Sequence, residues 1–283
     1  MEKEKNIKKK NSIINKKNWW LYLLGIVIII VHFIPIYVLL GVSAKSSMDV
    51  SSKWILPGYI EWNNFKEALD GGDLLNAYKN TAIITFFSVV FITLLGAFSA
   101  YPLARNRSKF NMGIKGFILG IMMIPGLSIL VPLYGVLNKI HGLSTYWGII
   151  VVLVTFNLPM SIFLFSNFIA GIPEALEEAA FIDGCGPIQA FFAIILPQLK
   201  PVIATVVIMT GVGCWNDYQF SLYFLQSPKY KTITLSVASY FSQTANNMNA
   251  AAASALLGVL PVLILFVFLQ KYFIQGMVDS AVK

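Results

Sequence analysis

Long apolar runs separated by shorter polar segments make up most of the chain. Six of these runs reach the roughly 20 residues that an α-helix needs to cross the hydrocarbon core of a bilayer. They cover residues 19–44, 78–103, 116–137, 146–170, 201–225 and 250–273. The pattern therefore predicts an all-α, polytopic membrane protein with six transmembrane helices.

The first run could also be the apolar core of a secretory signal peptide. Basic residues precede it, and Val42-Ser43-Ala44 resembles a cleavage site. The run is far longer than the roughly 7–15 apolar residues of a signal peptide. We therefore expect an uncleaved transmembrane helix.

Composition supports a membrane protein and excludes other classes. Of the 283 residues, 57% are hydrophobic and 12% are charged, against about 45–50% and 25% in soluble domains. A soluble domain of this size could not bury that much apolar surface. An aromatic content of 14% argues against disorder, and two cysteines argue against a disulfide scaffold. Neither the cysteines nor the two histidines have metal-ligand spacing, so no metal site is predicted.

Basic residues gather at the start of the chain and in one loop. Seven lysines precede residue 18, and Arg105, Arg107, Lys109 and Lys115 lie between the second and third runs. Because Lys and Arg concentrate on the cytoplasmic side of membrane proteins, both termini are expected in the cytoplasm. This clustering accounts for the net charge of +8. The sequence has no nucleic-acid-binding motif, so no nucleic-acid partner is expected.

The segment 171–200 differs from the other loops because its sequence predicts two short helices. Pro173 suits the start of a helix, where its missing N–H costs nothing. Glu174, Glu177 and Glu178 follow in the first turns, where the helix dipole favours negative charge. Gly184 is expected to end this helix in a turn with positive φ.

The second helix should begin at Pro187, and Leu196-Pro197 with Pro201 should break the chain before the fifth run. Small residues such as Ala179 and Ala180 give the first helix a face that a partner's groove can approach closely. The alternative is an interfacial helix on the membrane. Anionic lipid would repel its acidic face, whereas a basic groove on a protein would suit it.

The spacing within this segment carries a family resemblance. Glu178-Ala179-Ala180, three residues, Gly184, nine residues and then Ile194-Ile195-Leu196-Pro197 resembles the EAA loop of ABC importer permeases of the carbohydrate-uptake class. Trp215-Asn216-Asp217 and the C-terminal residues 276–283 also resemble that class. The resemblance covers roughly residues 19–283.

The resemblance implies a type I ABC importer permease fold with a cytoplasmic coupling helix. It implies a cytoplasmic segment at 1–18, a permease domain at 19–275 and a cytoplasmic tail at 276–283. The implied partners are a homologous second permease, two cytoplasmic ATPases, an external solute-binding protein and the lipid bilayer. The implied ATPase-coupling residues are Glu174, Glu177, Glu178, Ala179, Ala180, Asp183, Gly184, Leu196 and Pro197.

The chain is expected to be a permease for a di- or oligosaccharide in the cell membrane and not an enzyme. It contains no G-x-x-x-x-G-K-[ST] loop, so ATP and Mg²⁺ should bind to the partner ATPases. We therefore expect no cofactor and no catalytic residue in this chain.

Asp217 is the acidic residue placed most deeply in a predicted span. Because burying a charge in a membrane is costly, an acidic residue there is expected to serve a function. Aromatic, amide and carboxylate groups together suit a sugar, which has apolar faces and many hydroxyls. The alternative is that Asp217 lies near the outer interface and pairs with a neighbouring helix. The candidates for the substrate path are Trp215, Asn216, Asp217, Tyr218, Tyr134 and Asn157.

Two outer loops stand out by length. Residues 45–77 should hold a short helix near 64–69. Residues 226–249 are rich in aromatic and amide side chains, and they form either a solvated lid or a surface that docks the binding protein.

The alternative function is a self-sufficient secondary transporter or channel for a small polar solute. Such a carrier needs paired ionisable residues near the membrane midplane, and the third to fifth runs offer Asp217 alone. An intramembrane protease is disfavoured because no histidine follows Ser128 in a later run.

Overall fold

The structure, a computed structural model, describes residues 19–71, 73–243 and 247–281, and every regular element in these ranges is helical. The longer helices are α2 (Trp19–Ala44), α3 (Trp62–Gly71), α4 (Leu74–Arg105), α5 (Lys109–Met122), α6 (Leu130–Lys139), α7 (Tyr146–Ala170), α11 (Lys200–Trp215), α13 (Ile233–Gln243) and α14 (Met248–Ala281). The shorter elements are η2 (Gly126–Ile129), α8 (Ala175–Ile182), α9 (Pro187–Ala190), the π-helical turn η3 (Phe191–Ile195), α10 (Leu196–Gln198), α12 (Gln219–Phe224) and η4 (Pro228–Tyr230).

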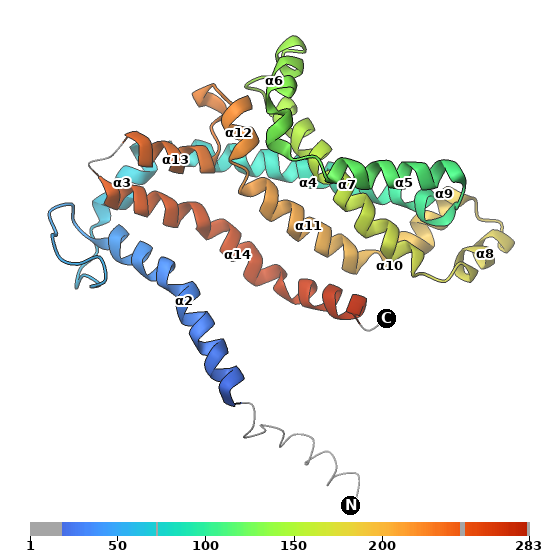
Figure 1. Cartoon of the computed structure of the whole chain (residues 1–283), viewed down its shortest axis with the longest axis horizontal. Coiled ribbons are helices and arrows are strands. Elements are labelled where there is room, and N and C mark those ends of the chain that lie inside the picture. Colours follow the sequence, from blue (N-terminus) through green and yellow to red (C-terminus); the bar gives the residue numbers. More distant parts are fainter. Residues whose placement is uncertain (1–18, 72, 244–246, 282–283) are drawn as a thin grey trace, which may run out of the picture.

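Helices α4, α7, α11 and α14 form the central bundle. α4 packs along α7, and α11 packs against both α4 and α14 (Figure 1). The approach of α4 to α7 is close, because a Cβ atom on Gly96 would overlap the Ser161 hydroxyl. That hydroxyl donates to the Ile92 carbonyl at 3.2 Å, and Phe165 is fully buried beside it. Small residues on α4 thus set the geometry of the core.

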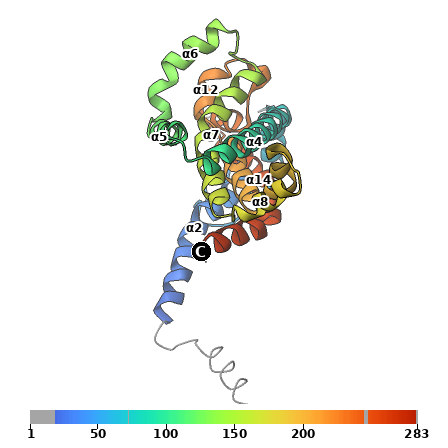
Figure 2. The same ribbon diagram turned by 90° about the vertical axis from the view of Figure 1, so that its right-hand side faces the viewer.

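The bundle has two distinct ends. α8 lies at one end of the long axis, and α3 and α13 lie at the other (Figure 1). α2 buries residues at its C-terminal end, Gly41–Ser43, and the rest of it extends away from the bundle, as α6 does at another side (Figure 2).

Four predicted runs match single helices. α2 and α7 have the predicted bounds, whereas α4 and α14 extend beyond theirs at both ends. α14 continues through Ala281, so residues 276–281 of the predicted tail belong to this helix. The predicted segment 1–18 lies outside the described residues. The short helix expected near 64–69 is confirmed as α3.

The third and fifth runs are not continuous helices. Pro125 predicts a kink in the third run, whereas the break in the fifth run corrects the prediction. Residues 123–125 interrupt the third run, and the helices on either side meet at 91°. Pro125 lies at this break, where its ring disfavours helical backbone in the preceding residue. The fifth run stops at Trp215 and resumes at Gln219. The break predicted before that run is present at Leu199, between Pro197 and Pro201, with a bend of 73°.

Three described helices, α2, α4 and α7, are long and apolar enough to cross a membrane by themselves. Counting each bent pair as one broken span raises the number to 5, and the described part of α14 contributes a shorter apolar helix, Met248–Ile264. Six spans therefore remain a prediction.

Replacing Gly96 should separate α4 from α7. Gly96→Val places a branched side chain against Ser161 and Phe165, and overpacking of this kind costs about 1–3 kcal/mol. The measurement is the thermal unfolding midpoint of the detergent-solubilised chain. Gly25→Val is the control, because nothing lies within 4 Å of a Cβ at that helical position. Equal midpoints for the two variants would contradict the close packing.

Candidate functional site

Helix α8 is closed at its C-terminal end by its own backbone. Gly184 has φ +86°, as predicted. The Gly184 amide donates to the Phe181 carbonyl at 3.1 Å, and the Cys185 amide donates to the Ala180 carbonyl at 2.9 Å. These two bonds form a Schellman motif, which satisfies carbonyls that the helix end leaves unpaired. The short helix is thus a defined structural unit.

The two faces of α8 differ in exposure. Glu177 and Ala180 are buried against the rest of the chain, whereas Glu178 and Ala179 are exposed. Of the predicted coupling residues, Glu177 and Ala180 therefore face the bundle, whereas Glu178 and Ala179 face outward. Exposed apolar side chains flank the exposed glutamate, and they include Leu176, Phe181, Ile182 and Ile188.

Glu177 is buried because it forms an ion pair with Arg105. Arg105 Nε donates to Glu177 Oε1 at 2.6 Å, and the Tyr101 hydroxyl donates to Glu177 Oε2 at 2.8 Å. Arg105 Nη1 also donates to the Ile169 carbonyl at 2.9 Å. In the sequence, Arg105 belongs to the basic loop that orients the chain, and Tyr101 belongs to no motif. The residues next to Glu177 in the sequence do not indicate that its side chain is buried. The pairing of Glu177 with Arg105 therefore could not be predicted from the sequence pattern.

The remaining predicted coupling residues lie in or near the same segment. Glu174 precedes the first turn of α8, and its carbonyl accepts the amides of Glu177 and Glu178. Asp183 is exposed at the C-terminal end of α8. Leu196 and Pro197 begin α10, after the π-helical turn. The structure thus gathers these residues at the end of the bundle that carries α8.

The predicted substrate-path residues do not form one hydrogen-bonded cluster. Asp217 acts as a helix cap: its carboxylate accepts the Phe220 amide at 3.3 Å and the Ser221 amide and hydroxyl at 2.8 Å each. Asn157 and Asn216 donate to carbonyls four residues earlier in their own helices. The side chains of Asp217, Asn157 and Asn216 thus bond to backbone or side-chain groups nearby in the sequence.

The aromatic candidates are separate from one another. Tyr218 is exposed, and the Tyr134 hydroxyl lies 3.5 Å from the Gln226 side-chain oxygen. α12 packs against both α6 and α7, and the Phe156 and Phe220 rings lie 4.5 Å apart. α12 is therefore the element that brings this region together.

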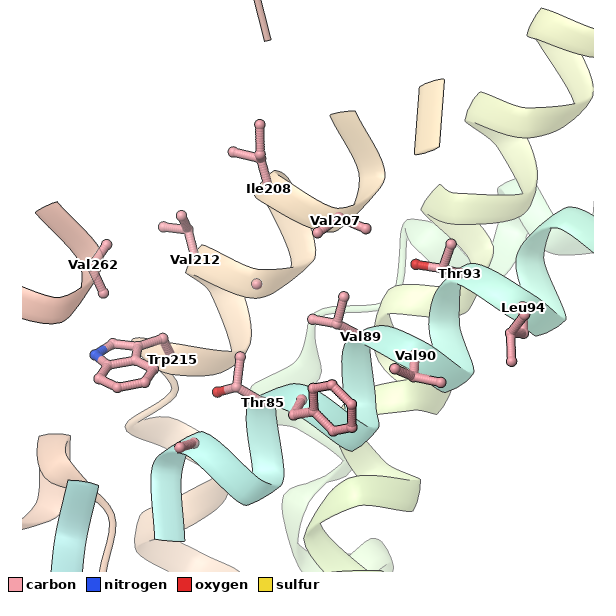
Figure 3. A pocket seen from close by; sticks show the side chains of 13 residues that line it. Thr85, Val89, Val90, Thr93, Leu94, Val207, Ile208, Val212, Trp215 and Val262 are labelled. Atoms are coloured by element: carbon pink, nitrogen blue, oxygen red, sulfur yellow. The ribbon is translucent and has the colours of Figure 1, made fainter. Parts of the chain in front are cut away.

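Trp215 lines a groove of about 570 Å³ between α4 and α11, with Val262 of α14 at its edge (Figure 3). Aliphatic side chains such as Val89 and Ile208 form most of the lining (Figure 3). The Thr85 and Thr93 hydroxyls and Trp215 Nε1 are buried in it without a hydrogen-bond partner among the described residues. Buried polar atoms are rarely left unpaired in a complete assembly.

The loop before α13 is fixed to the bundle at the end opposite α8. Asn80 Nδ2 donates to the Lys229 and Lys231 carbonyls at 2.9 Å each, and Asn80 Oδ1 accepts from Tyr146 at 2.6 Å. The Tyr240 hydroxyl donates to the Glu67 carbonyl of α3 at 2.6 Å. Burial and the nearby Glu67 carboxylate raise the pKa of Tyr240. The predicted loop 226–249 is therefore largely structured, although residues 244–246 lie outside the described ranges.

Comparison with protein families decides the class of the chain. Residues 92–279 match the family described as "Binding-protein-dependent transport system inner membrane component". The chain belongs to this family. It is thus a multi-pass permease of a binding-protein-dependent transport system, which confirms the predicted permease role.

Similar proteins extend the match over nearly the whole permease. The "Melibiose/raffinose/stachyose import permease protein MelC" of Bacillus subtilis is 44% identical over 262 residues, which cover 92% of this chain and 95% of that protein.

Two solved structures share the fold. A bacterial ABC transporter that imports the acidic polysaccharide alginate matches with a TM-score of 0.78 and 20% identity, covering 92% of this chain and 99% of the other. A bacterial alginate ABC transporter in complex with an alginate pentasaccharide-bound periplasmic protein matches with a TM-score of 0.67 and 18% identity, covering 90% and 93%. The predicted ABC importer permease fold is therefore confirmed.

Substitutions at Asp217 should separate capping from a role of its charge. Asp217→Ala should lower the free energy of unfolding by about 0.5–2 kcal/mol, because α12 loses its cap. Asp217→Asn should keep transport within roughly twofold of wild type, because its one side-chain oxygen can still accept the Ser221 amide and hydroxyl. Thermal unfolding and transport in membrane vesicles are the measurements. Loss of transport in a stably folded Asp217→Asn variant would contradict a capping role alone.

Proposed function

We propose that this permease forms half of the translocation path of an ATP-driven importer for a di- or oligosaccharide. In this proposal, a homologous permease supplies the other half, and two cytoplasmic ATPases bind ATP and Mg²⁺. The solute-binding protein delivers the sugar from outside. The observation that carries the proposal is the exposed helix α8, internally capped and held at one end of the bundle.

α8 has the properties of a helix that seats in a groove of another protein. Apolar Leu176 and Ile182 are exposed on α8 as Glu178 is, and Ile182 is 86% exposed. A short amphipathic helix buries such side chains when it enters an apolar groove. Glu178 would face a basic group at the groove's edge. A partner ATPase, with α8 as its coupling helix, accounts for this surface in a chain whose sequence has no P-loop.

A second permease would cover surfaces that this chain leaves open. α5 has no buried residue, and nothing lies within 4 Å of a Cβ at Gly116 or Gly120. Glycines spaced in this way allow close approach of another transmembrane helix. α2, which is exposed over most of its length, would also contact lipid or the second permease.

A sugar substrate is supported by the name of the Bacillus subtilis relative, a melibiose, raffinose and stachyose import permease. In this proposal, the sugar path passes the region around α12. The aromatic rings along this path would be those of Trp215, Tyr218 and Tyr134, and the amides would be those of Asn216 and Asn157. Asp217 caps the start of α12.

The binding protein would dock at the end of the bundle that carries α3 and α13. Phe241 is 52% exposed there, whereas Tyr240 is buried by its bond to α3. The basic segment 1–18 and the basic residues near α5 favour the opposite end as cytoplasmic, with both termini on that side.

Gly184→Val should uncouple transport without loss of the permease. The positive φ of Gly184 is strained for a branched side chain, at about 1–3 kcal/mol. Nothing lies within 4 Å of its Cβ position, so the strain distorts the end of α8 without a clash. The measurements are ATPase co-purification and uptake of raffinose, the probe sugar chosen from the relative's name, both per permease copy.

Gly186→Val is the matched control. Its φ of −79° suits any residue, and its Cβ position is also open. Gly186→Val should transport normally, while Gly184→Val loses transport. Equal transport by both variants would contradict the coupling role of this turn.

Glu178→Lys should weaken the hold on the ATPase. The side chain is exposed, so charge reversal leaves the fold intact but repels a basic groove. Less ATPase should co-purify, and raffinose uptake should fall. Asp70→Lys reverses an exposed charge on α3 at the other end and should retain the ATPase. Wild-type ATPase retention in Glu178→Lys would contradict docking through α8.

A further inference from the structure

The buried cluster of Arg105, Glu177 and Tyr101 lies where α8 meets the bundle. The exposed fractions of the Arg105 and Glu177 side chains are 13% and 6%. Both carboxylate oxygens of Glu177 accept hydrogen bonds, one from Arg105 and one from Tyr101. Glu177 is therefore fully engaged within this chain and is not available to a partner's groove, unlike its neighbour Glu178.

The cluster joins three helix ends with favourable electrostatics. Arg105 is the last residue of α4, and its Nη1 donates to the Ile169 carbonyl near the end of α7. Glu177 lies in the first turn of α8. Helix C-termini carry partial negative charge and N-termini partial positive charge. The cation at two C-terminal ends and the anion at one N-terminal end therefore each match the local dipoles.

α8 also packs against α9 and η3, and Phe191 of η3 lies against Phe98 and Tyr101 of α4. In the part of the chain that the structure describes, Glu177 is the one α8 side chain that hydrogen-bonds to α4 or α7. Short backbone links at residues 171–174 and 183–186 lead to α7 and α9. The ion pair thus links α8 to α4 directly, beside the indirect route through the turns and the packed η3 segment.

α4 continues from this cluster to the other end of the molecule. It is a single helix of 32 residues (Figure 1). Near its first turns, Asn80 holds the carbonyls of Lys229 and Lys231, which precede α13. One continuous helix therefore carries α8 at one end and the α13 loop at the other.

We propose that Arg105 and Glu177, with Tyr101, are a positioning pair that makes α8 and α4 move together, so that displacement of α8 by the ATPase is passed to the bundle. The proposal rests on the proposed function, because it takes α8 as the ATPase-coupling helix. Buried ion pairs contribute little net stability compared with apolar residues, whereas they can fix one arrangement of the elements they join. A fixed arrangement is what a mechanical joint between two helices requires.

The test uses the complete importer in proteoliposomes: both permeases, the ATPases and the binding protein, with raffinose as the probe. The readout is the ratio of sugar transported to ATP hydrolysed, with ATPase co-purification measured in parallel. Glu177→Gln and Arg105→Gln should keep the ATPase bound but lower this ratio roughly tenfold. The double variant should be no worse than either single variant, because each breaks the same joint.

A milder pair of variants covers the case in which an uncompensated buried charge prevents accumulation of the protein. Tyr101→Phe removes one hydrogen bond to Glu177 and keeps the ring. It should lower the transport-to-hydrolysis ratio by roughly threefold. Tyr78→Phe, the control, removes a bond from α4 to the Leu257 carbonyl of α14 and should leave the ratio unchanged.

The outcomes separate this inference from the proposed function. A wild-type ratio in Glu177→Gln and Arg105→Gln, or equal losses in Tyr101→Phe and Tyr78→Phe, overturns the positioning pair. Either result can occur while Glu178→Lys still releases the ATPase, which leaves the coupling helix in place. Wild-type ATPase retention in Glu178→Lys instead removes the proposed function itself.

Discussion

Helix ends in or near a bilayer leave amides and carbonyls without intrahelical partners, and hydrocarbon supplies none. This constraint explains where the chain uses its scarce polar side chains. Arg105 donates to the Ile169 carbonyl at the end of α7. Asp217 accepts the Phe220 and Ser221 amides at the start of α12. Asp217, which the sequence suggests for the substrate path, thus forms hydrogen bonds with backbone amides.

The same bonds determine which parts of the chain are connected. A side chain such as Asn157, which donates to a carbonyl of its own helix, does not connect that helix to another element through this bond. Asn80 and Arg105 instead reach from α4 to segments about 150 and 72 positions away in the sequence. Because they lie near opposite ends of α4, the two surfaces proposed to meet partner proteins are connected by one continuous helix.

The sequence predicts the elements whose limits coincide with changes in hydropathy. α7 begins where the Thr145 hydroxyl accepts the Gly148 amide, at the edge of the apolar run, and its predicted bounds hold. Pro125 indicates the break at 123–125, whereas the break at 216–218 is missed because apolar residues continue on both sides of it. In the candidate site, the turn at Gly184 follows from local spacing. The Arg105–Glu177 pair does not, because its members are 72 positions apart and are brought together by the packing of α4 and α7.

The groove in Figure 3 departs from this pattern. The chain satisfies buried polar groups at its helix ends, yet the hydroxyls of Thr85 and Thr93 and the indole nitrogen of Trp215 are buried without partners in the described ranges. Two of these residues lie on α4, and Trp215 ends α11, so both helices contribute to one incomplete surface. These atoms have almost no exposed surface within this chain, so a helix packed on the groove would cover its apolar lining without reaching them. The groove is therefore an apolar contact surface, and its unpaired polar atoms specify no partner.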